Sequence, residues 1–375
     1  MKVSRIECDY LVLSLEIPVR GTYRDYGVQL VSVTTDEGIV GTGFARAYDF
    51  HGVSVAHTIL EEIAPFVVER DFAAPGEMWH EAAFDLPFGD WRRPNGVTNS
   101  AIGAVDQALW DAWGQKLGEP VYRLLGGSQR EIALYATFGL NIYTPEEEME
   151  AARLVQAKGF TAFKLQGVDD RGGKLDAAVG RVQRLRETVG DDAEIILDAH
   201  GNYDLYEASS LLRALRPFRV AYVDEPLRSR DPLTYRKLRE EVPDVPIAAR
   251  SRAGSYADNR DLIISGGLSL MGSNVMDQGG YTQTIKVAHL AEAYDLRMVT
   301  GGAFHLHNSH LIAAATNGWM SEYHTFAAAL SETIFVDVIR PEGGRLVMGD
   351  RPGLGLTPDP DAVAEAKARA ATATR

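Results

Sequence analysis

Three short apolar runs of the sequence end in polar side chains that could do chemistry together. The runs end in Lys164-Leu165-Gln166, in Asp198-Ala199-His200 and in Asp224-Glu225-Pro226. Side chains alternate along a strand, so Lys164 and Gln166 face the same side. Carboxylates on neighbouring strand ends, such as Asp198 and Glu225, can bind one hard cation such as Mg²⁺. Any one of these residues could instead cap a helix or end in solvent, but the three ends together predict one functional site.

The elements that position these residues follow a regular rhythm. Buried strand-like runs lie at 133–138, 161–165, 194–197, 220–223, 246–248, 268–271 and 296–299, with a weaker run at 320–323. Amphipathic helical stretches such as 145–157, 176–189, 205–215 and 282–293 separate them. About eight strands at intervals of ~25 residues are typical of a parallel (β/α) barrel, whose active site lies at the carboxyl ends of its strands. A doubly wound open sheet has the same rhythm, and the barrel is the favoured prediction.

The first third of the chain has a different pattern. Residues 3–15 alternate like a strand, and 28–34 with 40–44 are typical of a hairpin. Helices are expected at 52–70, 74–86 and 99–117, the last with Ser100 as a candidate N-cap. Strands followed by helices predict a small α+β domain that ends near Gly126-Gly127. The tail from Glu332 onward breaks the rhythm and predicts a return segment.

Several motifs resemble, in the right order and over nearly the whole chain, proteins of the enolase superfamily, in the mandelate racemase and muconate lactonizing enzyme subgroup. They are the run 108–127, Phe163-Lys164-Leu165, Asp198-Ala199-His200-Gly201-Asn202, Asp224-Glu225-Pro226, Pro246-Ile247-Ala248 and Gly279-Gly280-Tyr281-Thr282. The resemblance implies an α+β capping domain at 1–125, completed by 331–375, over a (β/α)₇β barrel at 126–330. It also implies a Mg²⁺-assisted reaction that begins with proton abstraction next to a substrate carboxylate.

The resemblance further implies three acidic metal ligands, of which this sequence keeps two, Asp198 and Glu225. The third position falls on Ser251, which like Asn202 is a weak neutral ligand, and Arg250 stands just before it. A guanidinium at this point could place a fixed positive charge where the cation is expected and bind a carboxylate itself. Two alternatives therefore stay open: weak Mg²⁺ binding by the two carboxylates and water, or Arg250 in place of the metal.

Both bases that the resemblance implies are also missing. The base expected on the second barrel strand falls on Gln166, an amide that cannot abstract a proton. The acid of the sixth strand falls on Asn274, and the histidine of the seventh falls on Gly301 or Gly302. A family mechanism cannot be copied whole onto this chain.

The remaining polar residues near strand ends supply the other candidates. His200 follows Asp198 by two positions, which resembles the Asp-x-His-Gly arrangement of some acid-sugar dehydratases, where the histidine is a general acid. Its alternative is a hydrogen-bond partner of Asp198. The candidate catalytic residues are Lys164, His200 and His305. The candidate substrate-binding residues are Gln166, Arg250, His307, Asp277 and, in the segment 20–27 that is expected to form a specificity loop, Tyr23 and Arg24. His305 and His307 could equally face solvent, and His310 is expected to be structural.

We expect a lyase or isomerase that acts on a small hydroxy acid or sugar acid, as a dehydratase or a cycloisomerase. A racemase fits less well, because it needs a base on each face of the reacting carbon. One alternative is a carboxylate-binding protein that has lost the ancestral activity. Another is an enzyme of new chemistry that uses Lys164 as a base, its pKa lowered by the nearby Arg250.

The amino-acid composition limits the classes of molecule that the protein is expected to bind. The chain has 375 residues, with 38 Lys and Arg against 52 Asp and Glu, for a net charge of −14. Such a balance argues against nucleic acid or an anionic membrane as a partner and leaves a small-molecule carboxylate. The single cysteine, Cys8, cannot form an intrachain disulfide. No signal peptide or membrane span is evident, so we expect a soluble, cytoplasmic homo-oligomer.

Overall fold

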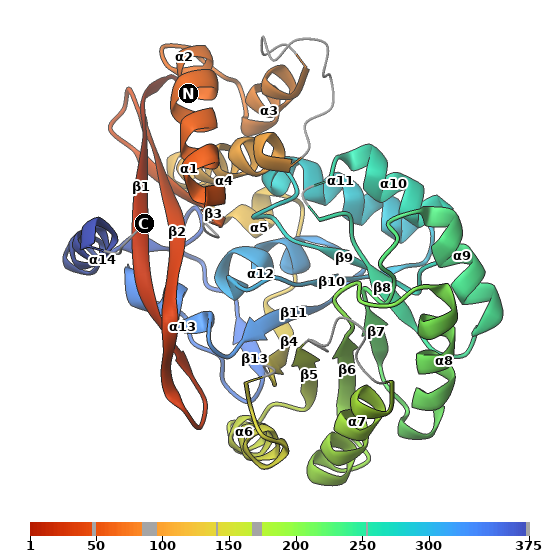
Figure 1. The fold of residues 1–375 in the computed structure, drawn as a ribbon. Helices are drawn as coiled ribbons and strands as arrows, with labels where there is room; N and C mark the ends of the chain where they lie inside the picture. The colour runs from red at the N-terminus through yellow and green to blue at the C-terminus, as the bar shows by residue number, and fades with distance from the viewer. Residues whose placement is uncertain (47–49, 85–95, 140–141, 167–174, 253, 373–375) are drawn as a thin grey trace.

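The computed structural model describes residues 1–46, 50–84, 96–139, 142–166, 175–252 and 254–372. Its larger part is a barrel of parallel strands (Figure 1). The strands are β4 (Glu131–Phe138), β5 (Ala162–Gln166), β6 (Glu194–Asp198), β7 (Tyr222–Asp224), β8 (Ile247–Ala249), β9 (Leu270–Ser273), β10 (Arg297–Thr300) and β11 (Gly318–His324). Each strand pairs with the next, and β11 pairs with β4. This closing pair confirms the barrel and excludes the open sheet.

Helices surround the barrel and follow its strands. They are α6 (Pro145–Ala157), α7 (Leu175–Val189), α8 (Leu205–Leu215), α9 (Pro232–Glu241), α10 (Tyr256–Ile264), α11 (Gly280–Ala293) and α12 (His305–Ala314). Thr144, Asp204 and Ser255 begin α6, α8 and α10 with capping boxes, in which side chain and backbone exchange two hydrogen bonds. These local bonds set where each helix starts and so fix the loops at the carboxyl ends of the strands.

The barrel interior is filled by one apolar side chain from each strand. This layer consists of Tyr135, Ala162, Ile196, Tyr222, Ala248, Leu270, Val299 and Met320. The Tyr135 hydroxyl donates a hydrogen bond to the Thr300 carbonyl oxygen at 2.5 Å. The barrel is therefore a packed core and not a pore, and it closes the site from below.

The N-terminal part forms an antiparallel sheet backed by helices. The sheet consists of β1 (Val3–Ile17), β2 (Gly21–Thr35) and β3 (Val40–Arg46), and its helices are α1 (Phe50–His57), η1 (Thr58–Ile63), α2 (Ala64–Val67), α3 (Pro75–Phe84) and α4 (Gly96–Leu117). β3 packs so closely on α4 that a Cβ added to Gly43 would lie 2.1 Å from the Ala104 carbonyl oxygen.

Two local predictions for this part are wrong. Ser100 does not cap α4 but lies inside it, where its hydroxyl donates to the Gly96 carbonyl oxygen at 3.3 Å. The segment expected as a specificity loop belongs to β2 from Gly21 onward, because its backbone pairs with β1. The side chains of Tyr23 and Arg24 lie outside the described part of the chain.

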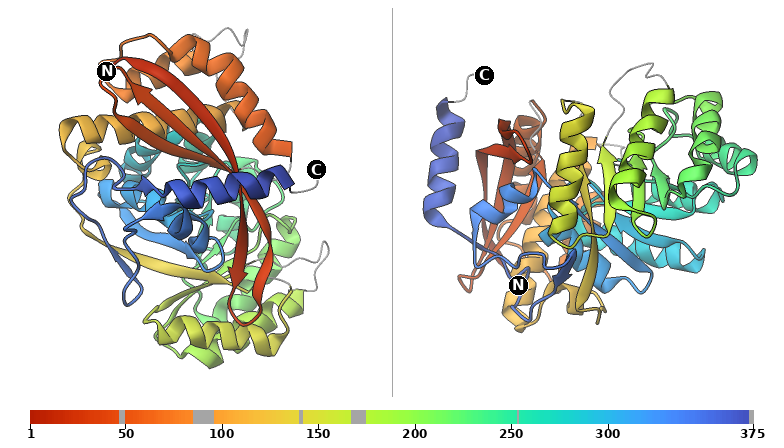
Figure 2. Two further views of the ribbon diagram at one scale, coloured as in Figure 1. Left: turned by 90° about the vertical axis from the view of Figure 1, so that its left-hand side faces the viewer. Right: turned by 90° about the horizontal axis from the view of Figure 1, so that it is seen from below.

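The C-terminal tail returns along both parts. After α5 (Val121–Leu124) and the barrel come α13 (Ala328–Ile334), β12 (Phe335–Val336), β13 (Arg345–Val347), β14 (Thr357–Pro358) and α14 (Pro360–Thr372). β13 pairs antiparallel with β4, and α14 lies across the long β1–β2 hairpin (Figure 2). Lys367 Nζ contacts Asp9 Oδ1 at 2.6 Å there. The predicted domain bounds stay a prediction, as do the homo-oligomer and the cytoplasmic location. Within the described ranges, no helix is long and apolar enough to cross a membrane.

Asp111, on α4, joins three segments that are far apart in sequence. Its Oδ2 accepts a hydrogen bond from the Thr42 backbone N at 2.8 Å, and its Oδ1 accepts one from the Leu354 backbone N at 2.8 Å. The side chain is almost completely buried, so both donors depend on it. The carboxylate thereby ties β3 and the C-terminal tail to α4.

We expect Asp111→Ala to lower the free energy of unfolding by roughly 3 kcal/mol, because two buried N–H groups lose their acceptor. Chemical denaturation of the variant and the wild type measures the change. Asp36→Ala, at an exposed aspartate, is the matched control and is expected to stay within about 0.5 kcal/mol of the wild type. An equal small change in both variants contradicts the bridging role.

α12 is buried on every side, histidines included. His305 and His307 are completely buried, and no ring nitrogen of either has a hydrogen-bond partner among the described residues. The His307 ring packs on Phe44 at 5.3 Å between centroids and on Phe335 at 6.2 Å. Burial lowers the pKa of both histidines to about 3. Both rings are therefore neutral core side chains.

The buried histidines make stability depend on pH. Below the ordinary histidine pKa near 6.5, the unfolded chain binds a proton at His307 that the folded chain does not, so stability falls as the pH falls. We expect His307→Leu to remove roughly 1 kcal/mol of the loss of stability between pH 7.5 and pH 5.5. Denaturation curves at both pH values measure it, with the exposed His289→Gln as control. An unchanged loss in His307→Leu contradicts this account.

Candidate functional site

The mouth of the barrel is lined by the residues that follow its apolar layer. Two positions beyond the apolar residue of each strand, the side chain again points into the barrel, because alternate residues face one side. This mouth layer consists of Thr137, Lys164, Asp198, Asp224, Arg250, Gly272, Gly301 and Glu322. It lies at the carboxyl ends of the strands, where barrel enzymes hold their active sites. The strand pleat therefore brings Lys164, Asp198 and Arg250 together. Of the two directions that the sequence leaves open for Arg250, the structure has the inward one.

Lys164 is the cation at the centre of this layer. Its Nζ lies 2.5 Å from Asp224 Oδ2, 3.0 Å from Asp198 Oδ2 and 3.8 Å from Glu322 Oε1. Burial alone would lower the pKa of Lys164, but the Asp198 and Asp224 carboxylates raise it well above its usual value. Lys164 is therefore an ammonium group. The hypothesis of a Lys164 base whose pKa is lowered by Arg250 is wrong.

The two carboxylates beside Lys164 differ in their electrostatics. Burial raises the pKa of Asp198, but the Lys164 ammonium and His200 outweigh burial and hold it well below its usual range. Burial raises the pKa of Asp224 to about 6. The Lys164 ammonium opposes this rise, whereas the nearby Asp198 and Glu225 carboxylates add to it. A single ammonium group cannot fully compensate two buried carboxylates.

Glu322 closes the layer from the last strand. Its Oε1 accepts a hydrogen bond from Thr137 Oγ1 at 2.7 Å, and its Oε2 accepts hydrogen bonds from the backbone N–H groups of Gly302 and, at 2.9 Å, Ala303. Burial would raise its pKa, but Lys164 and these donors hold it at about 2. Glu322 is therefore a fixed anion that holds the loop after β10 in place.

Glu225 leaves the strand alternation and turns toward a different partner. Its φ is 47°, in the left-handed region that non-glycine residues avoid. Arg252 Nε donates to both of its carboxylate oxygens, at 3.0 and 2.7 Å, and Arg250 Nε lies 3.7 Å from Oε1. Burial would raise the pKa of Glu225, but the two guanidinium groups lower it. In strand register it is Asp224, and not Glu225, that faces Asp198.

Arg250 fills the part of the mouth that two glycines leave open. A Cβ added to Gly301 would lie 2.4 Å from Arg250 Nη1, and one added to Gly272 would lie 3.4 Å from Arg250 Cβ. The side chain is 6% exposed, and its Nε makes no hydrogen bond within the described part of the chain. Burial would lower its pKa, but Glu225 and then Asp277 raise it. Arg250 therefore points inward as a permanent cation.

His200 stands at the rim, next to Asp198. Its Nε2 lies 3.3 Å from Asp198 Oδ2, and its backbone N–H donates to Asp198 Oδ1 at 3.0 Å. The Asp198 carboxylate raises the pKa of His200. The side chain is 31% exposed, and φ is 49°. A strained backbone that presents a carboxylate-bound imidazole to solvent is the kind of feature that marks functional sites.

The carboxylates of the mouth do not fit a divalent cation as they stand. Asp198 and Asp224 share the Lys164 ammonium, and Glu225 is bound by Arg252 with Arg250 beside it. Among the residues that the structure describes, no group of three His, Cys, Asp or Glu side chains is placed to hold one metal ion. The weaker candidates lie in the loops after β6 and β8, where the Ser251 backbone N donates to Asn259 Oδ1 and the Asn202 carbonyl oxygen accepts from Arg228.

The other predicted site residues lie partly elsewhere. Gln166 ends β5 beside Asp198 in register, and its buried Oε1 has no hydrogen-bond partner in the described ranges. Asp277 lies near Arg250 and accepts a hydrogen bond from Asn274 Nδ2 at 3.4 Å. His305 and His307 are not in the mouth. The α12 helix folds back onto the outside of β11. His305 therefore packs on Tyr323, a side chain of β11 that points away from the barrel axis.

Sequence reasoning missed Asp224, Glu322 and Arg252. Asp224 lies two residues after Tyr222 and so faces the same side of the strand, and this alternation could have been read from the sequence. Glu322 ends a weaker apolar run, and the same alternation points it inward. Arg252 follows its strand by three residues, so no periodicity could place it.

Family models match most of the chain. Residues 14–126 match the mandelate racemase / muconate lactonizing enzyme N-terminal domain, and residues 146–362 match the enolase C-terminal domain-like model. A D-galactonate dehydratase from Pectobacterium atrosepticum is 31% identical over 87% of this chain and 87% of its own length. An arabinonate dehydratase from Saccharolobus solfataricus is 30% identical over 87% of this chain and 86% of its own.

Solved structures agree with these matches. A racemase from Streptomyces coelicolor A3(2) with bound magnesium is 26% identical, with a TM-score of 0.86 over 97% of this chain and 99% of that one. An L-talarate dehydratase from Polaromonas sp. JS666, complexed with Mg and L-glucarate, is 26% identical, with a TM-score of 0.85 over 97% of this chain and 96% of that one. Fold, motif order and both domain matches agree: the chain belongs to the mandelate racemase / muconate lactonizing enzyme group of the enolase superfamily.

Proposed function

We propose that this protein is a sugar-acid dehydratase, a lyase that removes water from a small polyhydroxy carboxylate. The observation that carries the proposal is the Asp198–His200 pair at the open end of the barrel, with 3.3 Å between Oδ2 and Nε2. The carboxylate orients the imidazole, an arrangement that suits acid–base catalysis. The two relatives aligned over 87% of the chain support it, since they are dehydratases of galactonate and of arabinonate.

His200 can carry both proton transfers of a dehydration. The proton on the carbon next to the substrate carboxylate goes to the imidazole as the carbon–hydrogen bond breaks. The hydroxyl on the following carbon then leaves with a proton from the imidazolium, as water. A carbon–carbon double bond forms between the two carbons, and the enol product becomes a keto acid. Since Asp198 engages Nε2, Nδ1 is the nitrogen that this scheme uses for proton transfer.

This scheme needs a base on only one face of the substrate. Gln166 stands at the position of one usual base, and glycine stands at the position of the other. Racemisation is therefore the least compatible reaction. A second candidate, a carboxylate-binding protein without turnover, is favoured by the ion pairs that already engage Asp198, Asp224 and Glu225.

We expect the protein to convert at least one of galactonate, arabinonate and glucarate to a keto acid. His200→Asn is expected to lower kcat by roughly 100-fold or more while the protein stays folded, because it removes the only group that moves the proton. Keto-acid formation measures turnover, and deuterium uptake from D₂O next to the carboxylate measures proton abstraction.

The exposed His289→Gln is the control for loss of a histidine elsewhere. Turnover that survives in His200→Asn would show that another residue moves the proton. Binding of these acids with neither exchange nor turnover in the wild type would exclude the dehydratase and leave the binding protein.

A further inference from the structure

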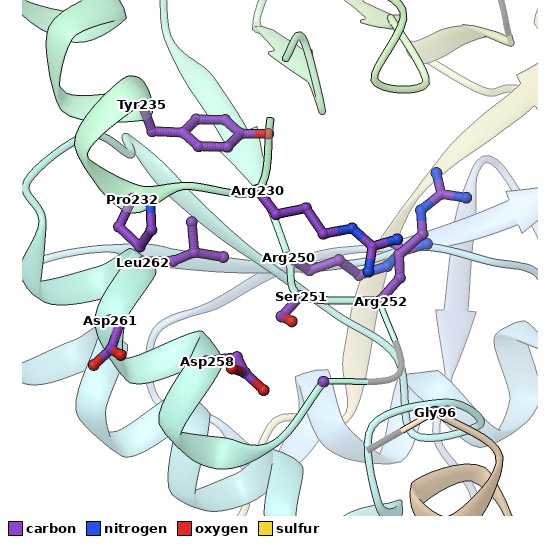
Figure 3. A pocket seen from close by; sticks show the side chains of 11 residues that line it. Gly96, Arg230, Pro232, Tyr235, Arg250, Ser251, Arg252, Asp258, Asp261 and Leu262 are labelled. Carbon is purple, nitrogen blue, oxygen red and sulfur yellow. The ribbon is translucent and has the colours of Figure 1, made fainter. Parts of the chain in front are cut away.

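A cavity of about 590 Å³ opens beside the mouth, between the loops that follow β7 and β8. Its volume lies within the range of small-molecule sites, roughly 300–1,000 Å³. Its lining includes three arginines and two aspartates: Arg230, Arg250, Arg252, Asp258 and Asp261. Figure 3 shows the side chains of the three arginines on one side of the cavity, with the two aspartates lying apart from them on α10.

The protein balances only part of the positive charge in this cavity. Glu225 is the carboxylate bound by both Arg250 and Arg252. Arg230 makes no ion pair with any residue of the described ranges and is exposed. The aspartates of the lining have other partners. Asp258 accepts from the Ser255 hydroxyl at 2.7 Å, and Asp261 pairs with Arg260.

Guanidinium groups that line one cavity repel one another, and an anion bound between them reduces this repulsion. This concentration of positive charge stands in a chain of net charge −14. Arg250 adds an independent sign, because its buried Nε has no hydrogen-bond acceptor in the described part of the chain. A guanidinium group matches a carboxylate in planarity and can donate two parallel hydrogen bonds to it.

The opposite side of the mouth cannot take the carboxylate. Lys164 is shared by Asp198 and Asp224, with Glu322 also nearby. A substrate anion would meet an excess of negative charge there. Hydroxyl groups, which can donate hydrogen bonds to these carboxylates, suit that side instead.

We propose that Arg230, Arg250 and Arg252 bind the carboxylate of the substrate and do so without a divalent cation. The proposal rests on the proposed function for the identity of the substrate as a sugar acid. It agrees with the misfit between the carboxylates of the mouth and a metal: these carboxylates are already paired with cationic side chains, and the arginines supply the positive charge that orients the substrate. The reacting carbon then lies toward His200, with its hydroxyls toward Asp198.

Calorimetry of the full-length protein tests this directly, with D-galactonate, arabinonate and L-glucarate as probes. Galactitol, which lacks the carboxylate, is the neutral control. We expect at least one acid to bind in EDTA with the same affinity as in Mg²⁺, and galactitol to bind at least 10-fold more weakly than galactonate or not at all. Arg230→Gln is expected to weaken binding of the acid about 10-fold or more. Arg236→Gln, at an exposed arginine of α9 that pairs with Glu240, is expected to bind like the wild type.

Binding that is lost in EDTA and restored by Mg²⁺ would overturn the proposal. So would wild-type affinity in Arg230→Gln, or failure of all three acids to bind. The two proposals fail in distinguishable ways. Arginine-dependent binding without turnover removes the dehydratase and keeps the carboxylate site, whereas turnover that Arg230→Gln leaves unchanged removes the carboxylate site and keeps the dehydratase.

Discussion

The buried ammonium of Lys164 is the interaction around which the mouth of the barrel is arranged. It lies within 4 Å of carboxylates from three different strands, those of Asp198, Asp224 and Glu322. Buried charges of this kind are tolerated only when they compensate one another, and removing one member leaves the others uncompensated. Two of the three carboxylates in turn hold a neighbouring segment: Glu322 the loop after β10, and Asp198 the backbone of His200. The reactive rim is thus supported by the same ion cluster that closes the core.

Arg250 and the two glycines near it form one structural unit. Arg250 needs the space that a side chain at Gly301 would occupy, since a Cβ there would lie 2.4 Å from Nη1. A side chain at Gly301 would therefore require the end of the Arg250 side chain to move. Two departures from the family pattern, which look independent in the sequence, are neighbours in space. The consequence is electrostatic, because a permanent guanidinium charge now stands beside Ser251, the position at which the resemblance implies the third metal ligand.

A left-handed backbone at the strand ends lets adjacent residues bind different partners. Asp224 follows the pleat and joins Lys164, whereas the left-handed backbone of Glu225 turns its carboxylate to Arg250 and Arg252. Two consecutive acids consequently serve two different cations. His200 has the same left-handed conformation after β6, and it too points away from the path of its strand. The mouth therefore has an anionic side around Lys164 and a cationic side around the arginines.

The sequence by itself favoured the barrel and determined most of its element bounds and the placing of Lys164 and Asp198 at strand ends, but it left the direction of Arg250 open. Strand alternation and helix periodicity are local, so they can be read along one chain; α6 and α8 lie at the predicted positions for this reason. Asp224 and Glu322 obey the same alternation and were within reach of it. The tertiary structure alone decided which charges pair.

Glu225 and Arg252 meet because a left-handed turn breaks the alternation, and α12 buries His305 and His307 because it folds back outside β11. Neither this ion pair nor this burial follows from the periodicity of the sequence. Ion pairing and burial depend on distances between segments far apart along the chain, and only the closed barrel sets those distances.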